Sequence, residues 1–397
     1  FTLGVGYSKL ADFNTTSAAY GQGIDKSITD VLAEYMNGVP LSSLGHPDND
    51  PYQPFRRADV GLWGGILAYQ TGILDPMSDA QDNKQYTVAN NLATGSRTNP
   101  SMRNVNKGSI DEYSISGGFN IQNILYLGFT IGIQDILYRN DNYYAETYDN
   151  NSLPLNGMNY IRSLHLDGTG VNFKFGAVVR PVENLRIGVA VHTPTLVSIN
   201  EEYIEWMSAD YKNTARGELL DSPRSLNEYD INTPTRLLTG ISYTLPGVGL
   251  ITADYERVWY NRMKLRNMGT ENWDFQQTIN NEVSSFYQPA NNFRVGIEAT
   301  PAQNFYIRAG YANYGECIAT RDAFNNMSSI NSYENYSAGL GFRFQNMYVD
   351  LAYIYTEYKY APYTMFYYGD PDYVVNPGNV ETKQSRNTIT MSVGVRF

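Results

Sequence analysis

The sequence has no long hydrophobic run, one cysteine and three histidines, and each shortage excludes a class of protein. A membrane-spanning helix needs about 18 or more consecutive apolar residues, and the best apolar stretch, residues 61–74, is too short. The lone Cys317 excludes disulfide frameworks and thiolate metal sites. Because His46, His165 and His192 are far apart in the sequence, we also expect no histidine metal site and no cofactor.

Positive charge is scarce as well, and the formal net charge is −11. Nucleic-acid binding requires a concentrated basic surface, so no nucleic-acid partner is expected. Enzymatic signals are weak, because His192 lies in no nucleophile motif and the acidic residues Asp48 and Asp50 lack the fixed spacing of a calcium loop. The sequence therefore predicts no catalytic and no metal-binding residues. A hydrolase would require a histidine aligned with a serine on one face of a sheet.

Tyrosine is the abundant residue type, with 34 copies beside 34 glycines and 16 phenylalanines. Tyrosine has a high β propensity, and its amphipathic ring is favoured at the level of lipid headgroups. The composition therefore favours a β protein in a membrane. A tyrosine-rich soluble β protein is the alternative.

The last ten residues, Thr388–Phe397, alternate strictly between apolar and polar or small side chains. Successive side chains of a strand point to opposite faces, so Ile389, Met391 and Val393 share an apolar face with the terminal aromatic ring. Ten residues is about the length that a tilted transmembrane strand needs. This run predicts one strand of a transmembrane β-barrel.

The same alternation recurs in pairs of segments that are joined by very short turns rich in Pro, Asn and Gly. The pairs are 114–120 with 125–134, 171–180 with 185–191, 237–245 with 250–257, 293–300 with 305–314, and 336–344 with 347–355. Longer polar connections lie between the pairs, at roughly 12–108, 138–160, 206–228, 264–288, 317–332 and 360–385. Short turns at one end and long loops at the other are typical of an outer-membrane barrel. With residues 1–10 and 388–397 added, we expect twelve antiparallel strands in a single domain, 1–397.

The alternation also predicts which side chains face lipid. Phe173, Ile187, Val295 and Leu340 fall on the apolar, outward phase, and a charge at mid-bilayer on that phase would cost roughly 2–4 kcal/mol. Charged residues on the inward phase are expected to form a polar network in the lumen, the interior of the barrel, or else a substrate-selecting ring. These residues are Arg186, Asp254, Glu256, Arg294, Glu298, Arg308, Arg343 and Asp350.

The first long connection, 12–108, contains two segments with helical apolar spacing, near 24–36 and 61–74. Apolar helices in an extracellular loop must pack against each other, against the barrel mouth, or against a ligand. We therefore consider two alternatives, a self-packed cap and a hydrophobic ligand groove. The groove candidates are Leu62, Trp63, Ile66, Leu67 and Tyr69.

Three stretches of the sequence, 178–195, 255–263 and 293–301 with 307–311, resemble the recurrent strand–turn–strand segments of the FadL/TodX family of outer-membrane hydrophobic-compound transporters. The resemblance implies a barrel of fourteen strands with an amino-terminal hatch in its lumen. It also implies that the hatch and the first two strands are absent from this numbering, so that this segment or another chain would fill the lumen. Residues 1–10 would then be the third strand, which in the family carries a kink that opens the wall sideways, and Gly4 and Gly6 are the candidates for that lateral opening.

The function implied by the resemblance is passive uptake of hydrophobic small molecules, such as long-chain fatty acids or aromatic compounds, across the outer membrane of a Gram-negative bacterium. The expected partners are outer-membrane lipid and the hydrophobic substrate. The alternative is a barrel of the same fold that transports nothing and acts as a scaffold or partner in an envelope or secretion complex.

Overall fold

The computed structural model describes residues 1–44, 50–88, 97–149, 154–212, 219–269, 272–319, 330–360, 363–370 and 373–395. His46, Asp48 and the terminal Phe397, considered above, lie outside these ranges.

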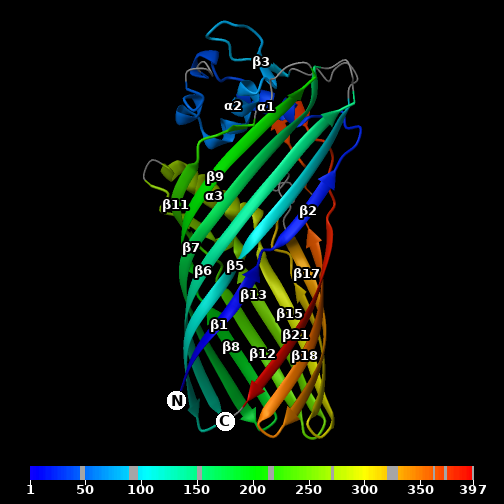
Figure 1. Ribbon diagram of the computed structural model, residues 1–397. Coiled ribbons are helices and arrows are strands. Elements are labelled where there is room, and N and C mark those ends of the chain that lie inside the picture. The colour runs from blue at the N-terminus through cyan, green and yellow to red at the C-terminus, as the bar shows by residue number, and fades with distance from the viewer. Residues whose placement is uncertain are drawn as a thin grey trace.

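A 17-stranded antiparallel sheet curves into a barrel-shaped wall (Figure 1). Its strands are β1 (Thr2–Asp12), β2 (Thr15–Tyr20), β5 (Thr98–Ile121), β6 (Leu125–Tyr148), β7 (Leu155–Val182), β8 (Leu185–His192), β9 (Leu196–Tyr211), β10 (Leu220–Asp221), β11 (Ser225–Asn232), β12 (Arg236–Leu245), β13 (Gly249–Trp259), β14 (Lys264–Arg266), β15 (Pro289–Ala302), β16 (Phe305–Tyr314), β17 (Ile330–Phe344), β18 (Met347–Tyr360) and β21 (Lys383–Val395). Two small sheets stand apart from it, β3 (Leu74–Pro76) with β4 (Tyr86–Val88) and β19 (Tyr368–Asp370) with β20 (Tyr373–Val375).

Several of these strands continue one another across a short break. Both β1 and β2 pair with β5, both β8 and β9 pair with β7, and β11 and β12 follow one another beside β9 and β8. Short β10 and β14 extend the pairing at the ends of β9 and β11. Over the described residues, the wall therefore has twelve strands, β1–β2, β5, β6, β7, β8–β9, β11–β12, β13, β15, β16, β17, β18 and β21, which confirms the expected number.

Tight turns join the strands at the end of the wall where both chain termini lie (Figure 1). Asn123, Gly247 and Asn304 in these turns have φ angles of 60°, 72° and 66°, a left-handed region that Gly and Asn enter most easily. This chemistry explains why Pro, Asn and Gly mark the hairpins in the sequence.

The alternation places apolar side chains on the outside and polar ones on the inside, as expected. Val295 and Ile297 are exposed on the outer face, whereas Arg294 and Glu298 alternate with them and contact Glu256 and Arg308. We call the outward apolar side chains the apolar belt; they include Phe129, Ile131, Phe173, Phe175, Ile187, Val189, Phe293, Val295, Ile297, Leu340, Leu351, Ile389 and Met391.

An outward row of tyrosines lies at one edge of the apolar belt. The ring centroids of Tyr311 and Tyr336 are 5.2 Å apart, and those of Tyr336 and Tyr355 are 6.4 Å apart. Aromatic girdles of this kind are typical of the membrane–water interface of barrels. Among the described helices, none is long and apolar enough to cross a membrane.

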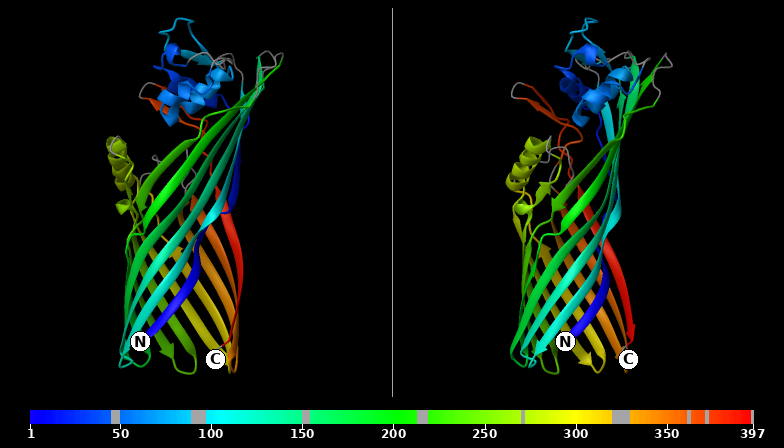
Figure 2. Two further views of the ribbon diagram at one scale, coloured as in Figure 1. Left: turned by 60° about the vertical axis from the view of Figure 1, so that its left-hand side comes forward. Right: turned by 90° about the vertical axis from the view of Figure 1, so that its left-hand side faces the viewer.

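The strands β5, β6, β7 and β9 extend far beyond the apolar belt on one side of the wall (Figure 2). This corrects the expectation that 138–160 is a loop, because β6 runs to Tyr148 and β7 begins at Leu155. The segment is polar on both phases, with Asn140, Asp141 and Asn142 in succession, so the two-residue rhythm that marks a lipid-facing strand is absent there.

The extended strands carry a cap, which we define as residues 21–44 and 50–88. It contains helices α1 (Ile28–Met36) and α2 (Trp63–Gln70), the short turns η1 (Leu41–Ser43), η2 (Pro54–Arg57) and η3 (Val60–Leu62), and the β3–β4 sheet. Another helix, α3 (Trp273–Phe286), follows the short turn η5 (Tyr260–Arg262) and β14, and lies beside the wall below the cap (Figure 2).

One junction of the wall differs from the others. No backbone ladder joins β1 to β21 within the described residues, and Val5 and Ile389 are 87% and 74% exposed. The recorded contact between these two flanks is a side-chain ion pair between Arg386 Nη2 and Asp12 Oδ2, 2.9 Å apart. We call this junction the seam.

Candidate functional site

The lumen wall carries charged side chains that are paired with one another. On β5, Glu112 accepts hydrogen bonds from Gln134 at 3.0 Å and Asn172 at 3.2 Å, and it forms an ion pair with Lys174. These partners come from β6 and β7 and reach Glu112 because they share the inward phase of neighbouring strands.

The second group surrounds Arg308, which the sequence predicted to face the lumen. Arg308 bridges Glu298 at 2.6 Å and Asp350 at 2.5 Å, so it ties β15, β16 and β18 together. The Arg343 guanidinium lies 4.7 Å from the ring centroid of Tyr306, a cation–π contact.

The third group surrounds Glu256, whose side chain is 5% exposed. Its carboxylate lies 3.3 Å from Arg294 Nη1 and 3.6 Å from Arg236 Nη1, and it accepts a hydrogen bond from Asn292 at 3.1 Å. Asp254 lies over Gly240, where an added Cβ would be 2.4 Å from its Oδ1.

Five of the eight predicted lumen residues belong to the two ion-pair groups around Arg308 and Glu256, and a sixth, Arg343, contacts Tyr306. Arg186 has no carboxylate partner among the described residues. Two important members were missed. Glu112 and Arg236 stand just outside the segments predicted as strands, at 114–120 and 237–245. Extending each alternating run by one or two residues would have found them.

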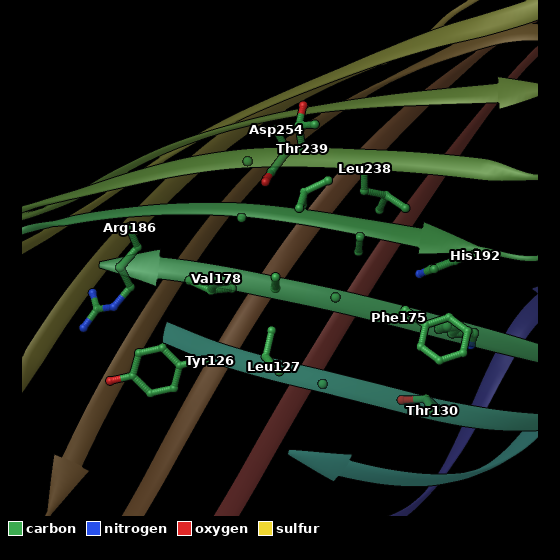
Figure 3. A pocket seen from close by; sticks show the side chains of 18 of the residues that line it. Tyr126, Leu127, Thr130, Phe175, Val178, Arg186, His192, Leu238, Thr239 and Asp254 are labelled. Carbon is green, nitrogen blue, oxygen red and sulfur yellow. The ribbon is translucent and has the colours of Figure 1, made fainter. Parts of the chain in front are cut away.

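A cavity of about 770 Å³ opens into the lumen along β6, β7, β8, β12 and β13 (Figure 3). Gly128, Gly176, Gly188 and Gly240 line it, and because they lack side chains the wall there is one backbone thick. Its charged lining residues are Lys174, Arg186, Asp254 and Arg294, so three cations face one acid, and His192 lies beside them. In the close view, Arg186 and His192 lie at opposite ends of β8.

The groove candidates lie mainly inside the cap. Trp63, Ile66 and Leu67 are almost completely buried in its apolar core, and Leu62 and Tyr69 pack against that core. The same core contains Tyr144, Met158 and Met207 of β6, β7 and β9, so the helix packs against the extended strands as well as within the cap. The sequence signal for close packing is the Gly64-Gly65 pair inside the helix, which was not used above.

We expect that Gly64→Ala destabilises the cap, because an added Cβ would lie 2.5 Å from the hydroxyl of Tyr160. That hydroxyl is hydrogen-bonded to Glu205 at 2.9 Å and is buried, so it cannot move freely. The expected cost is about 1–3 kcal/mol, measurable as faster hydrogen exchange of α2. Gly61→Ala is the matched control, since a Cβ there meets no atom within 4 Å. Equal exchange in the two variants would contradict this packing.

Two buried carboxylates hold the base of the cap. Glu146 on β6 is 1% exposed and accepts hydrogen bonds from the Ile28 amide at 2.8 Å and the Ser27 hydroxyl at 2.5 Å, at the start of α1. Glu205 on β9 accepts from Tyr160 at 2.9 Å and Tyr203 at 2.6 Å. Burial raises the pKa of both carboxyl groups above the usual range.

Gly4 and Gly6, the candidates for a lateral opening, pair regularly with Ser116 and Ser114 on β5. The register shift of β1 lies further along, between Lys9 and Ala11. The departure from regular pairing is therefore not at the glycines. The opposite edge of β1 borders the seam, where no backbone ladder joins β1 to β21 among the described residues.

The fold and the lumen together define a class: a barrel-shaped antiparallel sheet with an apolar exterior and a charged, cavity-containing interior.

No family model matches the sequence, and no curated protein matches it. Among solved structures, the chain is similar to a FadL homologue of Pseudomonas aeruginosa, with a TM-score of 0.47 and 14% identity over 81% of this chain and 75% of that one. It is also similar to the toluene transporter TbuX of Ralstonia pickettii, with a TM-score of 0.42 and 12% identity over 76% and 78% of the two chains. The toluene transporter TodX of P. putida gives 0.35 and 11% over 81% and 84%. These similarities concern the fold, and we base the functional proposal on the residues of this chain.

Proposed function

We propose that the protein is an outer-membrane channel of a Gram-negative bacterium for passive uptake of hydrophobic small molecules. The observation that carries the proposal is the division between the two faces of the wall. The outer face bears the apolar belt, while the inner face bears ion pairs and a cavity of about 770 Å³. Apolar side chains outside and charged side chains inside are the arrangement of a membrane barrel, and the interior offers solutes a route across the membrane.

We further propose that substrates leave sideways through the seam. Elsewhere backbone ladders hold neighbouring strands, and opening a ladder would cost many hydrogen bonds. At the seam, the recorded link is the ion pair between Asp12 and Arg386, which is partly exposed. An exposed ion pair is worth only about 0–1 kcal/mol, so over the described residues the link between these two flanks is weaker than a backbone ladder.

Gly6→Trp is expected to lower the uptake of a labelled hydrophobic compound about tenfold, because the bulky side chain would obstruct the inner side of the seam. Gly296→Trp is the matched control. Both glycines face inward, and an added Cβ would meet one hydroxyl oxygen at 3.0 Å in each case. Uptake is measured with the full chain in liposomes and in a deletion strain. If Gly296→Trp slows uptake as much as Gly6→Trp, exit at the seam is wrong; if the unmodified protein moves no hydrophobic compound, the transport proposal is wrong.

One observation favours the alternative of a non-transporting scaffold. The helices of the cap are packed into an apolar core that they share with β6, β7 and β9, and Trp63, Ile66 and Leu67 are buried in it. A scaffold would keep its lumen closed to solutes and would co-purify with other envelope proteins. The uptake measurement separates the two functions directly.

A further inference from the structure

The charges of the lumen wall are not balanced. Of the five lumen acids, Glu112, Glu256, Glu298 and Asp350 each pair with a lysine or arginine, and Asp254 has no ion pair among the described residues. By contrast, Arg186 and Arg343 have no carboxylate partner among the described residues, and Glu256 is shared by two arginines. The chain as a whole has a net charge of −11, yet on this inner surface the cations outnumber the five acids by one. The six cations are Lys174, Arg186, Arg236, Arg294, Arg308 and Arg343. Such a surface attracts anions.

Next to these charges, tyrosines on neighbouring strands line up along the inner face. The rings of Tyr314 and Tyr333 are stacked, with centroids 4.1 Å apart and an angle of 14° between the planes. Tyr358 follows at 5.7 Å and Tyr360 at a further 6.5 Å. We call these four residues the tyrosine row. They stand on the phase opposite to Tyr311, Tyr336 and Tyr355, which form the outward girdle, and so they face the lumen.

Arg294 connects the charged groups with the tyrosine row. It lies 3.3 Å from Glu256 on one side. On the other side it is the diagonal neighbour of Tyr314 on the inward phase, because Asn292 pairs with Tyr314 and Arg294 pairs with Ala312. It also lines the lumen cavity. A solute at the Arg294 end of the cavity therefore meets a guanidinium group whose diagonal neighbour, Tyr314, begins the stack of aromatic rings.

We propose that this junction selects aromatic carboxylates, with the carboxylate at Arg294 and Arg236 and the ring against Tyr314 and Tyr333. Guanidinium groups bind carboxylates through paired hydrogen bonds, and aromatic rings associate by offset stacking or edge-to-face contact. A neutral arene can use the rings alone, and a saturated carboxylate the charge alone. The inference deepens the proposed function, on which it rests, by naming a substrate class.

Three ligands test the arginine part and the tyrosine part of the proposed site separately. Benzoate offers an aromatic ring and a charge, cyclohexanecarboxylate offers a charge without an aromatic ring, and toluene offers an aromatic ring without a charge. Binding to the purified full chain is measured for each ligand at pH 7.5 by titration calorimetry. We expect benzoate to bind about tenfold more tightly than either of the others, a difference of about 1.4 kcal/mol.

Substitutions then locate the site. Arg294→Gln should weaken benzoate binding about tenfold and leave toluene unchanged, and Tyr314→Leu should weaken benzoate and toluene but not cyclohexanecarboxylate. Arg343→Gln is the matched control, because Arg343 is also a lumen arginine beside a tyrosine ring, that of Tyr306. Heat-modifiable migration of each variant on a gel verifies that the barrel is folded.

Equal affinity for the three ligands, or an equal effect of Arg343→Gln and Arg294→Gln, would overturn the selective site. Failure of the proposed function looks different. In that case benzoate binds as expected but neither benzoate nor any hydrophobic compound crosses a membrane containing the protein.

Discussion

Replacing Val295 with arginine is expected to destabilise the folded barrel by roughly 2–4 kcal/mol. Val295 lies on the outer face in the middle of the apolar belt, is 53% exposed, and has Phe293 and Ile297 as its neighbours on the same phase. An arginine there would place a charged group against lipid hydrocarbon with no partner on the protein. The loss is measured by urea titration of the protein refolded in lipid vesicles, followed by tryptophan fluorescence.

Thr252→Arg is the control for this prediction. Thr252 pairs with Gly296 on the neighbouring strand and faces the lumen, where it lines the cavity close to Asp254. A charge added on this side remains in contact with water and with acidic groups, so the expected change is below about 1 kcal/mol. Equal losses in the two variants would mean that the outer face of β15 is not in contact with lipid.

The second large effect is expected at the base of the cap. Glu146→Ala removes a buried acceptor that receives hydrogen bonds from Ser27, Ile28, Tyr144 and Tyr148. Hydrogen bonds to a charged group are worth about 1.5–3 kcal/mol, and the start of α1 would be left with unpaired donors. We expect local opening of α1 to become easier by about 3 kcal/mol, which corresponds to hydrogen exchange on the order of a hundredfold faster.

Glu34→Ala on the same helix is the control, because its recorded hydrogen bond is an exposed one from Asn37. It should leave exchange in α1 nearly unchanged. If it matches Glu146→Ala, the carboxylate on β6 does not hold the cap.

The raised pKa of Glu146 gives this contact a pH dependence with a definite sign. Burial raises the pKa of this carboxyl above its ordinary value of 4.5, so the folded cap binds the proton more tightly than the open form does. The docked cap is therefore most stable below that ordinary value and loses stability as the pH rises through the raised pKa. Asp30, in the capping box of α1, has a pKa raised by burial as well, so Glu146→Gln should reduce the pH dependence of α1 exchange without abolishing it. An unchanged pH profile in this variant would contradict the assignment.

The fold could be predicted from the sequence wherever one face of a strand meets lipid. There, Phe293, Val295 and Ile297 alternate with Arg294 and Glu298, and the alternation fixes which side chains face outward, since a slip of one residue would put the charges outside. Tight turns at Asn123 and Asn304 mark the hairpins for the same local reason, the need for a left-handed backbone.

The prediction was poorer where both faces of a strand meet water or the cap. The upper parts of β6 and β7 were expected to be loop because their polar residues, such as Asn142 and Asn159, occur on both phases. Helix α3 was not expected either, since its side facing the protein holds Gln276 and Asn280, whose side chains bond the backbone of Met268 and Leu265. Polar docking of this kind leaves no apolar stripe in the sequence.

The lumen site was predictable in its composition but not in its pairing. The inward phase identified Arg294, Arg308 and Asp350, whereas the partners across strands depend on register, which sequence spacing alone does not give. The tyrosine row is a clear case, because Tyr314, Tyr333 and Tyr358 become neighbours only through the ladders of β16, β17 and β18.

The most direct test of the account is a spin-label scan of β15 from Phe293 to Glu298, with single cysteines introduced after Cys317 has been replaced by alanine. Dissolved oxygen concentrates in lipid, and a nickel chelate stays in water. We predict high oxygen accessibility at positions 293, 295 and 297 and high nickel accessibility at 294, 296 and 298. The opposite phase, or accessibility without alternation, would contradict a wall whose exterior faces lipid and whose interior is a polar lumen.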